Sequence, residues 1–256
     1  MMRAVFCLVS LLCILILPFS SFEVASAEQE LIVSAAASLT NAFGEIGKKF
    51  ESANPATRVV FNFAASGALL QQIDKGAPVD VFASADQMTM NQAAEKGLIV
   101  PGARKDFVSN ELVLIIPHGA KTTVEALKDL TAGEIGKIAL GNPQTVPAGR
   151  YAQEVLTNEG LWEELKPKFI FGESVRQVLD YVSRGEVDAG FVFATDAMLA
   201  KDHVKEVLEA PKHKPITYPI AVVGSTKNKD LATRFVDFVL SREGEEVLSK
   251  YGFKKP

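Results

Sequence analysis

The sequence predicts an α/β fold of mainly parallel sheets with helices on both faces. Short apolar runs, many of them β-branched, alternate with stretches whose apolar residues recur at helical spacing. The chain has 256 residues, of which 48% are hydrophobic, so it can bury a sizeable core. Neither a sequence repeat nor a linker rich in Pro, Gly and Ser divides it, so one domain and two interleaved domains both fit the pattern.

The alternation begins at 31–33, where Leu, Ile and Val follow one another, and continues with a helical pattern from 39 to 50. Further strands share short apolar runs, and we expect them at 58–63, 79–82, 112–116, 137–140, 169–171, 189–193 and 216–223, with a short one near Val207. Further helices share apolar residues three and four positions apart, and we expect them at 68–75, 87–96, 124–130, 148–158, 175–184, 229–240 and 242–251. Alternating strands and helices favour crossover connections over a parallel sheet.

The charge balance excludes one broad class of partner. The formal net charge is -4 at pH 7. Proteins that bind nucleic acids draw much of their affinity from a basic surface, so we expect no nucleic-acid partner here.

The N-terminal residues have the pattern of a secretory signal peptide. Arg3 precedes an apolar run over 4–17, and Ala-Ser-Ala at 25–27 supplies the small residues of a cleavage site. The run is shorter than the ~20 residues that a membrane-spanning helix needs. We therefore expect residues 1–27 to be removed and the mature chain to be released into the periplasm.

Both cysteines, Cys7 and Cys13, lie within this segment. The mature chain is therefore expected to contain no disulfide and no reactive thiol. Cys13 follows Leu12 rather than a small residue, which argues against a lipid anchor.

Small and polar residues fill four of the expected strand-to-helix turns, at 36–39, 64–67, 146–149 and 172–175. Any one of them is explained by helix capping alone. Helix N-termini, however, expose unpaired amides and a partial positive charge, and ligands of open parallel sheets bind at this end of the strands. Taken together, the turns predict a site in which neutral donors bind a compact oxyanion.

Six stretches carry a likeness to a known family. They are SAAASLT at 34–40, AASG at 64–67, GAPVDVFASAD at 76–86, GNPQTVPAG at 141–149, ESVR at 173–176 and VDAGFVFATDA at 187–197. In these stretches the chain resembles the periplasmic molybdate-binding proteins, which capture substrate for molybdate ABC importers. The resemblance implies a two-lobe periplasmic binding protein fold, with the anion held between the lobes. It places lobe 1 at 28–110 plus 218–256 and lobe 2 at 111–217.

The same resemblance implies a set of ligand-binding residues. Ser38 and Ser66 would bind oxygens through their hydroxyl groups and amides, while Ala148 and Val175 would donate backbone amides from lobe 2. The ligand would be molybdate or tungstate, with no cofactor and no direct metal ligand, since the metal arrives as an oxyanion. The expected partner is an inner-membrane ABC permease, and the expected state is a monomer.

One position departs from the family pattern. Phe193 stands where the family commonly has a tyrosine, so it is expected to form pocket wall without a hydrogen bond. Tyr151 either replaces the missing phenol or faces the core. Arg150 and Arg176 closely follow the proposed amide donors, and the rotation of about 100° per helical residue predicts that both point to solvent.

Two alternatives remain open at this stage. A binding protein for sulfate or phosphate would use similar donors, but hydrogen phosphate needs an acceptor, for which Glu173 is the only nearby carboxylate. A secreted serine hydrolase would use Ser66 as nucleophile, but its surroundings are not G-x-S-x-G. We therefore expect a transport protein and no enzyme.

Overall fold

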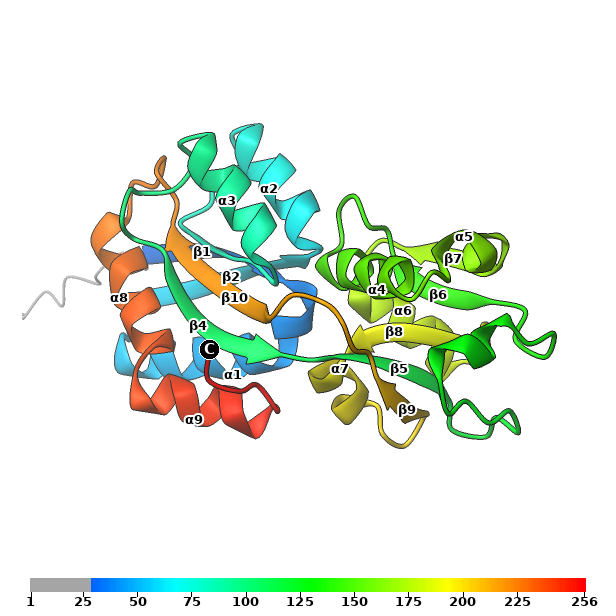
Figure 1. Ribbon diagram of the computed structural model, residues 1–256. Helices are drawn as coiled ribbons and strands as arrows, with labels where there is room; N and C mark the ends of the chain where they lie inside the picture. Colours follow the sequence, from blue (N-terminus) through cyan, green and yellow to red (C-terminus); the bar gives the residue numbers. More distant parts are fainter. Residues whose placement is uncertain (1–28) are drawn as a thin grey trace, which may run out of the picture.

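The structure, a computed structural model, describes residues 29–256, which form two lobes side by side (Figure 1). The expected signal peptide and its cleavage site lie outside the described residues. Over residues 29–256, no helix has the length and apolar character needed to cross a membrane.

Lobe 1 is built on a five-stranded sheet with the order β2-β1-β3-β10-β4. Its strands are β1 (Gln29–Ala36), β2 (Thr57–Ala64), β3 (Val81–Ala83), β4 (Lys105–Asn110) and β10 (Ile216–Val222). Its helices are η1 (Ala37–Leu39), α1 (Thr40–Ala53), α2 (Ser66–Asp74), α3 (Gln87–Glu95), α8 (Lys229–Val239) and α9 (Arg242–Lys250). Phe43 and Phe50 of α1 pack on Phe235 of α8, with ring centroids 6.2 and 5.2 Å apart, and join this half of the core.

Lobe 2 contains a second five-stranded sheet with the order β7-β6-β8-β5-β9. Its strands are β5 (Leu112–Pro117), β6 (Ile138–Gly141), β7 (Phe169–Gly172), β8 (Ala189–Phe193) and β9 (Val204–Glu209). Its helices are η2 (Leu127–Thr131), α4 (Pro147–Asn158), α5 (Trp162–Leu165), η3 (Lys166–Lys168), α6 (Val175–Ser183) and α7 (Ala194–Leu199). The expected short strand near Val207 is β9.

The α/β fold is confirmed, but both sheets are mixed rather than mainly parallel. Within the described residues, the parallel pairs are β1 with β2 and β3, and β6 with β7 and β8. The antiparallel pairs are β10 with β3 and β4, and β5 with β8 and β9. The difference arises at β10 and β5, the strands that take the chain into each lobe from the other, because each runs against the other strands of its sheet.

Several elements differ from the sequence prediction, among them the following three. The helix expected at 124–130 is only the 3-10 turn η2, where the Asp129 carboxylate accepts hydrogen bonds from the amides of Glu125 and Ala126. Strand β4 was not predicted, because its sequence KDFVSN is polar; it tolerates this because it lies at the edge of the sheet, next to β10. Helix α7, which follows β8 directly, was also not predicted, because it is too short to show the spacing of apolar residues that marks a helix.

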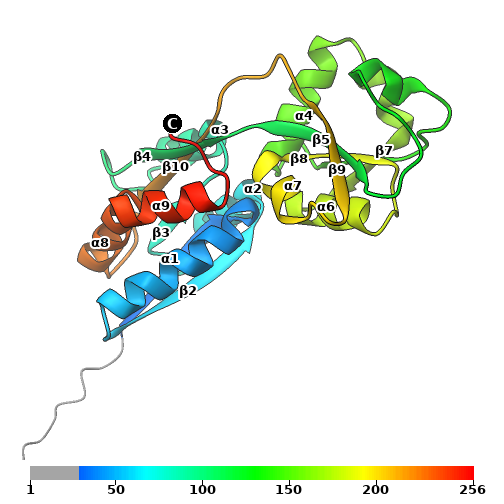
Figure 2. The ribbon, with the colours of Figure 1, turned by 90° about the horizontal axis from the view of Figure 1, so that it is seen from below.

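Two connections join the lobes (Figures 1 and 2). Strand β4 continues into β5 across one residue, and the chain returns from β9 to β10 through 210–215. We propose that the lobe boundaries follow these crossings, with residues 28–110 and 218–256 in lobe 1 and 111–217 in lobe 2.

The lobes also contact each other across the gap that separates their sheets. The amide of Gly67, at the start of α2, donates to the carbonyl of Thr145 in lobe 2 at 2.9 Å. A Cβ atom at residue 67 would lie 2.7 Å from that oxygen. Glycine is therefore required here by the approach of the other lobe.

Candidate oxyanion-binding site

A small cavity lies between the lobes where four helices begin. Strands β1 and β2 lead into η1 and α2, and strands β6 and β7 lead into α4 and α6. The cavity is lined by Ala36, Ala37, Ser38, Ala64, Ala65, Ser66, Ala85, Val146, Pro147, Ala148, Val175 and Phe193. The four turns singled out in the sequence therefore meet in space, and the structure brings Ser38, Ser66, Ala148, Val175 and Phe193 together.

Backbone amides are the main donors that these helices can offer. Ser66 and Val175 are the first residues of α2 and α6, Ala148 is the second residue of α4, and Ser38 lies in the single turn η1. Amides in the first turn of a helix have no partner within the helix and carry the positive end of its dipole. The cavity is therefore ringed by partial positive charge that needs no cationic side chain.

The hydroxyl group of Ser66 is oriented by the chain that follows β3. Its oxygen accepts a hydrogen bond from the amide of Ala85 at 2.9 Å, and the residue is fully buried. Because the oxygen already accepts one bond from the protein, its own proton is available to donate to a ligand.

The hydroxyl group of Ser38 is held by a tyrosine that sequence reasoning did not identify. Tyr218 of β10 places its phenol oxygen 3.0 Å from Ser38 Oγ, and Asn110 Nδ2 donates to that phenol oxygen at 3.2 Å. The Asn110 carbonyl accepts from the Glu111 amide, which fixes the orientation of its side chain. Burial raises the pKa of Tyr218, so the phenol stays protonated.

The direction of hydrogen bonding follows from this chain of contacts. The Tyr218 oxygen accepts from Asn110, and Ser38 Oγ is the acceptor within reach of the buried phenol proton, so we assign Tyr218 as the donor to Ser38. Ser38 thus becomes an acceptor within the protein and keeps its own proton for a ligand. In the sequence, Tyr218 is marked only as a tyrosine in a strand that crosses between the lobes, far from the four strand-to-helix turns.

Phe193 lines the cavity as expected and is 1% exposed. Its ring lies between Tyr151 and Tyr218, with centroid distances of 6.5 and 5.7 Å. Tyr151 is buried beside Phe193 and His213 but does not line the small cavity. Tyr151 therefore does not replace the missing phenol.

The prediction that Arg150 points to solvent is wrong. Its side chain is 16% exposed and forms an ion pair with Asp86 of lobe 1, with Nε and Nη2 at 2.9 and 2.6 Å from Oδ2. Nη2 also donates to Thr89 Oγ1 at 2.8 Å. The helical rotation does turn Arg150 away from the cavity, but the surface it reaches is the other lobe rather than water.

The same prediction is wrong for Arg176. Its Nε forms an ion pair with Asp196 Oδ1 at 2.5 Å, while Nη1 donates to Asn41 Oδ1 and Nη2 to the carbonyl of Ser38, at 2.8 and 3.3 Å. Asp196 is fully buried, and this burial raises its pKa to about 6 despite the opposing effect of Arg176. Arg150 and Arg176 thus tie lobe 2 to lobe 1 at two separate places.

Among the described residues that line the cavity there is no carboxylate. Glu173 is exposed and does not line it, so the acceptor that hydrogen phosphate needs is missing. The open space of the cavity, about 10 Å³, is close to that of one water molecule, so the lining of the cavity rather than its size indicates the class of ligand. Such a site suits a small, fully deprotonated oxyanion.

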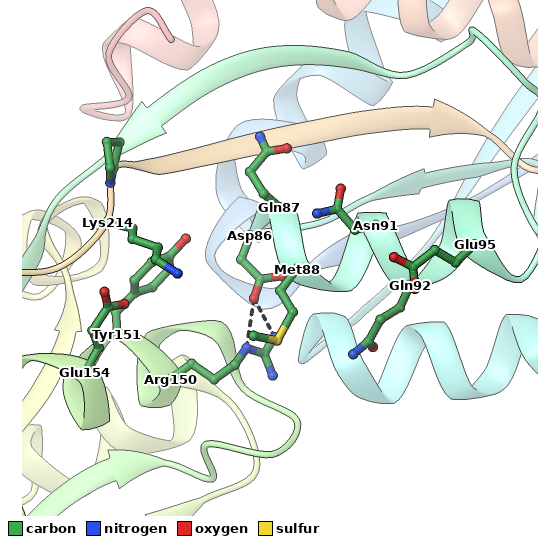
Figure 3. A pocket seen from close by; sticks show the side chains of 11 residues that line it. Asp86, Gln87, Met88, Asn91, Gln92, Glu95, Arg150, Tyr151, Glu154 and Lys214 are labelled. Carbon is green, nitrogen blue, oxygen red and sulfur yellow. Dashed lines mark hydrogen bonds and ion pairs between the residues drawn. The ribbon is translucent and has the colours of Figure 1, made fainter. Parts of the chain in front are cut away.

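A larger pocket of about 570 Å³ opens between α3 and α4 (Figure 3). Asp86 and Arg150 line one side of it, and Tyr151, Lys214 and Met88 are among its other residues. The residues that precede this ion pair, Ala85 in lobe 1 and Ala148 in lobe 2, line the small cavity instead.

Comparison with known proteins identifies the family of the chain. Residues 31–254 match the family model of bacterial extracellular solute-binding proteins. The chain is 37% identical to the molybdate-binding protein ModA of Haemophilus influenzae, over 89% of this chain and 91% of that protein. It is 38% identical to ModA of Escherichia coli, over 88% of this chain and 89% of that protein.

Solved structures show the same fold. The periplasmic molybdate-binding protein of Azotobacter vinelandii superposes with a TM-score of 0.79 at 25% identity, covering 88% of this chain and 99% of that one. The sulfate-binding protein SubI of Mycobacterium tuberculosis superposes with a TM-score of 0.77 at 15% identity, over 89% and 87% of the two chains, which shows the fold alone. With a family model that matches nearly its whole described length, this chain belongs to the bacterial extracellular solute-binding proteins.

Proposed function

We propose that this protein captures molybdate in the periplasm and delivers it to an inner-membrane ABC importer. The observation that carries the proposal is a cavity between two lobes that is lined by helix N-termini and two serine hydroxyls, with no carboxylate among its described residues. The molybdate-binding relatives, which align over most of the chain, support molybdate as the anion. Tungstate has the same charge and shape and is proposed as a second ligand.

Each proposed ligand contact has a separate origin. Ser38 and Ser66 donate from lobe 1 through hydroxyl and amide, while Ala148 and Val175 donate amides from lobe 2. Phe193 supplies apolar wall only. Because donors come from both lobes, the anion binds fully only when the lobes are closed.

The strength of such a site is sufficient for a scavenger. A hydrogen bond to a charged group contributes about 1.5–3 kcal/mol, so roughly six contribute about 9–18 kcal/mol. After several kcal/mol are lost to ordering and desolvation, the dissociation constant is expected between about micromolar and nanomolar.

Calorimetry tests the proposal directly. Residues 28–256 are titrated with molybdate, tungstate, sulfate and phosphate in turn, alongside Ser66→Ala. We expect tight binding of molybdate and tungstate, weak binding of sulfate and of phosphate, and a loss of at least about tenfold in Ser66→Ala. Equal affinity for sulfate would make the protein a general binder of tetrahedral dianions. Absence of binding to all four anions would refute the proposal.

The serine hydrolase has no support from the geometry. In the part of the chain that the structure describes, the Ser66 hydroxyl is bonded to the Ala85 amide and the Ser38 hydroxyl to Tyr218, and neither is bonded to a histidine. A non-enzymatic role in transport, as a monomer that a permease recognises in its closed form, is therefore the function that we propose.

A further inference from the structure

We propose that the Asp86–Arg150 ion pair is a specificity-determining wall, which restricts the site to oxyanions that carry no organic substituent. The inference rests on the proposed function. It concerns what separates the small cavity from the larger pocket beside it, and not the donors that hold the anion.

The position of the pair follows from the residues around it. Ala85 lines the cavity of about 10 Å³, and Asp86, the next residue, lines the pocket of about 570 Å³. On the facing lobe, Ala148 lines the cavity and Arg150 lines the pocket. Figure 3 shows the side chains of Asp86 and Arg150 meeting at the edge of the larger pocket.

The wall is firmly built because every donor of the guanidinium group is used. Nε and Nη2 donate to Asp86, Nη2 also donates to Thr89, and Nη1 donates to the carbonyls of Pro143 and Gln144, each at 3.3 Å. The five N–H groups of arginine are thereby accounted for. Arg150 has no donor left for an anion and acts as a barrier.

The carboxylate on the other side of the pair is equally engaged. Asp86 caps helix α3, since its Oδ1 accepts from the amide of Thr89 at 3.1 Å and from Ser84 Oγ at 3.3 Å. Its exposed fraction is only 4%. A buried pair of this kind, satisfied on both sides, moves only at a high energetic cost.

The consequence concerns substituted oxyanions such as phosphate monoesters. At pH 8 a monoester is a dianion with three terminal oxygens, because its second pKa is about 6. The donors of the cavity fit its charge, but its organic group needs a path out of the cavity. The larger pocket, which contains Tyr151 and Met88, could hold that group if the wall were absent.

The test uses a charge-balanced double variant, Arg150→Ala with Asp86→Ser. Serine keeps a cap on α3 while both charges are removed. Calorimetry at pH 8 measures molybdate and phenyl phosphate on the wild-type chain and on the variant. We expect the ratio of phenyl phosphate affinity to molybdate affinity to rise by roughly tenfold or more in the variant.

A matched control removes a second ion pair of lobe 2 whose arginine also bonds to lobe 1. Arg176→Ala with Asp196→Asn also breaks bonds between Arg176 and lobe 1, but Arg176 lies on the side of Ser38 and Asn41 rather than beside the larger pocket. We expect this control to lose molybdate affinity with no gain for phenyl phosphate. A gain in both double variants would show that looser closure, not the wall, admits the ester, and would overturn the proposal.

A milder variant protects the test against misfolding. Arg150→Gln with Asp86→Asn keeps polar side chains that still hydrogen-bond, and its ratio of phenyl phosphate affinity to molybdate affinity is expected to lie between those of the wild type and the first variant. Folded variants that bind molybdate but show no gain for phenyl phosphate would overturn the wall. A wild-type chain that does not bind molybdate would refute the proposed function, whereas the wall is judged only by the gain for the ester.

Discussion

At the scale of single residues, the site depends on how its hydroxyl groups are oriented. Ser66 accepts a hydrogen bond from the Ala85 amide, and Ser38 is bonded to the Tyr218 phenol, which we assign as the donor. Each hydroxyl group therefore keeps its own proton to donate to the anion. A carboxylate acceptor would defeat this arrangement, and none lines the cavity within the described residues.

Tyr218→Phe tests the orientation of Ser38. The variant loses the phenol that fixes Ser38 Oγ, so the Ser38 proton is free to turn away from the ligand. We expect molybdate affinity to fall by about five- to tenfold, which corresponds to the ~1 kcal/mol of one hydrogen bond. Tyr251→Phe is the matched control, because it removes a phenol that is bonded to Glu45 away from the cavity. Equal losses in both variants would contradict the role of Tyr218.

Asp196 gives a pH-dependent prediction. Its pKa is raised by burial to about 6 in the folded chain, against about 3.9 in an unfolded one. The folded state therefore binds more protons between pH 4 and 6, so the contribution of Asp196 to stability falls as pH rises through this range. The full effect is on the order of 2–3 kcal/mol.

Urea unfolding of the wild-type chain and of Asp196→Asn at pH 4.5, 5.5 and 7 measures this contribution. The variant cannot titrate at this position. We expect its free energy of unfolding, relative to that of the wild type, to rise with pH between 4.5 and 6 and then to level off. A difference that stays constant over the whole range would show that Asp196 titrates normally.

At the scale of elements, the site consists of helix starts. The four strand-to-helix turns were predictable because serine and proline are favoured where a helix begins, directly after a strand. What the local pattern could not show is the contact across the lobes. Gly67 is small because Thr145 approaches it, and Arg150 and Arg176 reach lobe 1 through contacts that are far away in sequence.

Gly67→Ala tests the close approach of α2 to lobe 2. The added methyl group would lie 2.7 Å from the Thr145 carbonyl oxygen in this arrangement of the lobes. We expect molybdate affinity to fall by roughly tenfold or more, since binding requires closure, while the thermal midpoint of the ligand-free chain changes little. Gly44→Ala in α1 is the control, because its Cβ would meet nothing within 4 Å. Unchanged molybdate affinity in Gly67→Ala would show that closure of the lobes does not require the close approach of residue 67 to Thr145.

The elements themselves were predicted unevenly, for physical reasons. Strands buried on both faces, such as β5 and β8, appear in the sequence as apolar runs. Edge strand β4 has no apolar run, and helix α7 is too short to show a helical spacing of apolar residues. The tyrosine that orients Ser38 lies in β10, where nothing in its own neighbourhood marks it as part of a site.

At the scale of the whole molecule, two crossings and a set of contacts between the lobes indicate a hinge. The contacts include those of Gly67, Arg150 and Arg176. An oxyanion that bridges both lobes binds the closed form better and shifts the population toward it.

Small-angle scattering tests the hinge. We expect the radius of gyration of the mature chain to decrease when molybdate is added, because the lobes approach each other. Phenyl phosphate serves as the control ligand and is expected to cause no decrease in the wild-type chain. An unchanged radius together with calorimetric binding of molybdate would remove closure from the mechanism.

The order of strands in lobe 1 has a consequence for biosynthesis. Strand β10 lies between β3 and β4, although it follows the whole of lobe 2 in the chain. As the polypeptide emerges from its N-terminus, β3 has an open edge until residue 222 appears, whereas the sheet of lobe 2 needs only contiguous chain. Lobe 2 is thus free to fold first, and the N-terminal segment stays without its partner strand. A chain that must thread through a membrane channel before it folds gains from that delay.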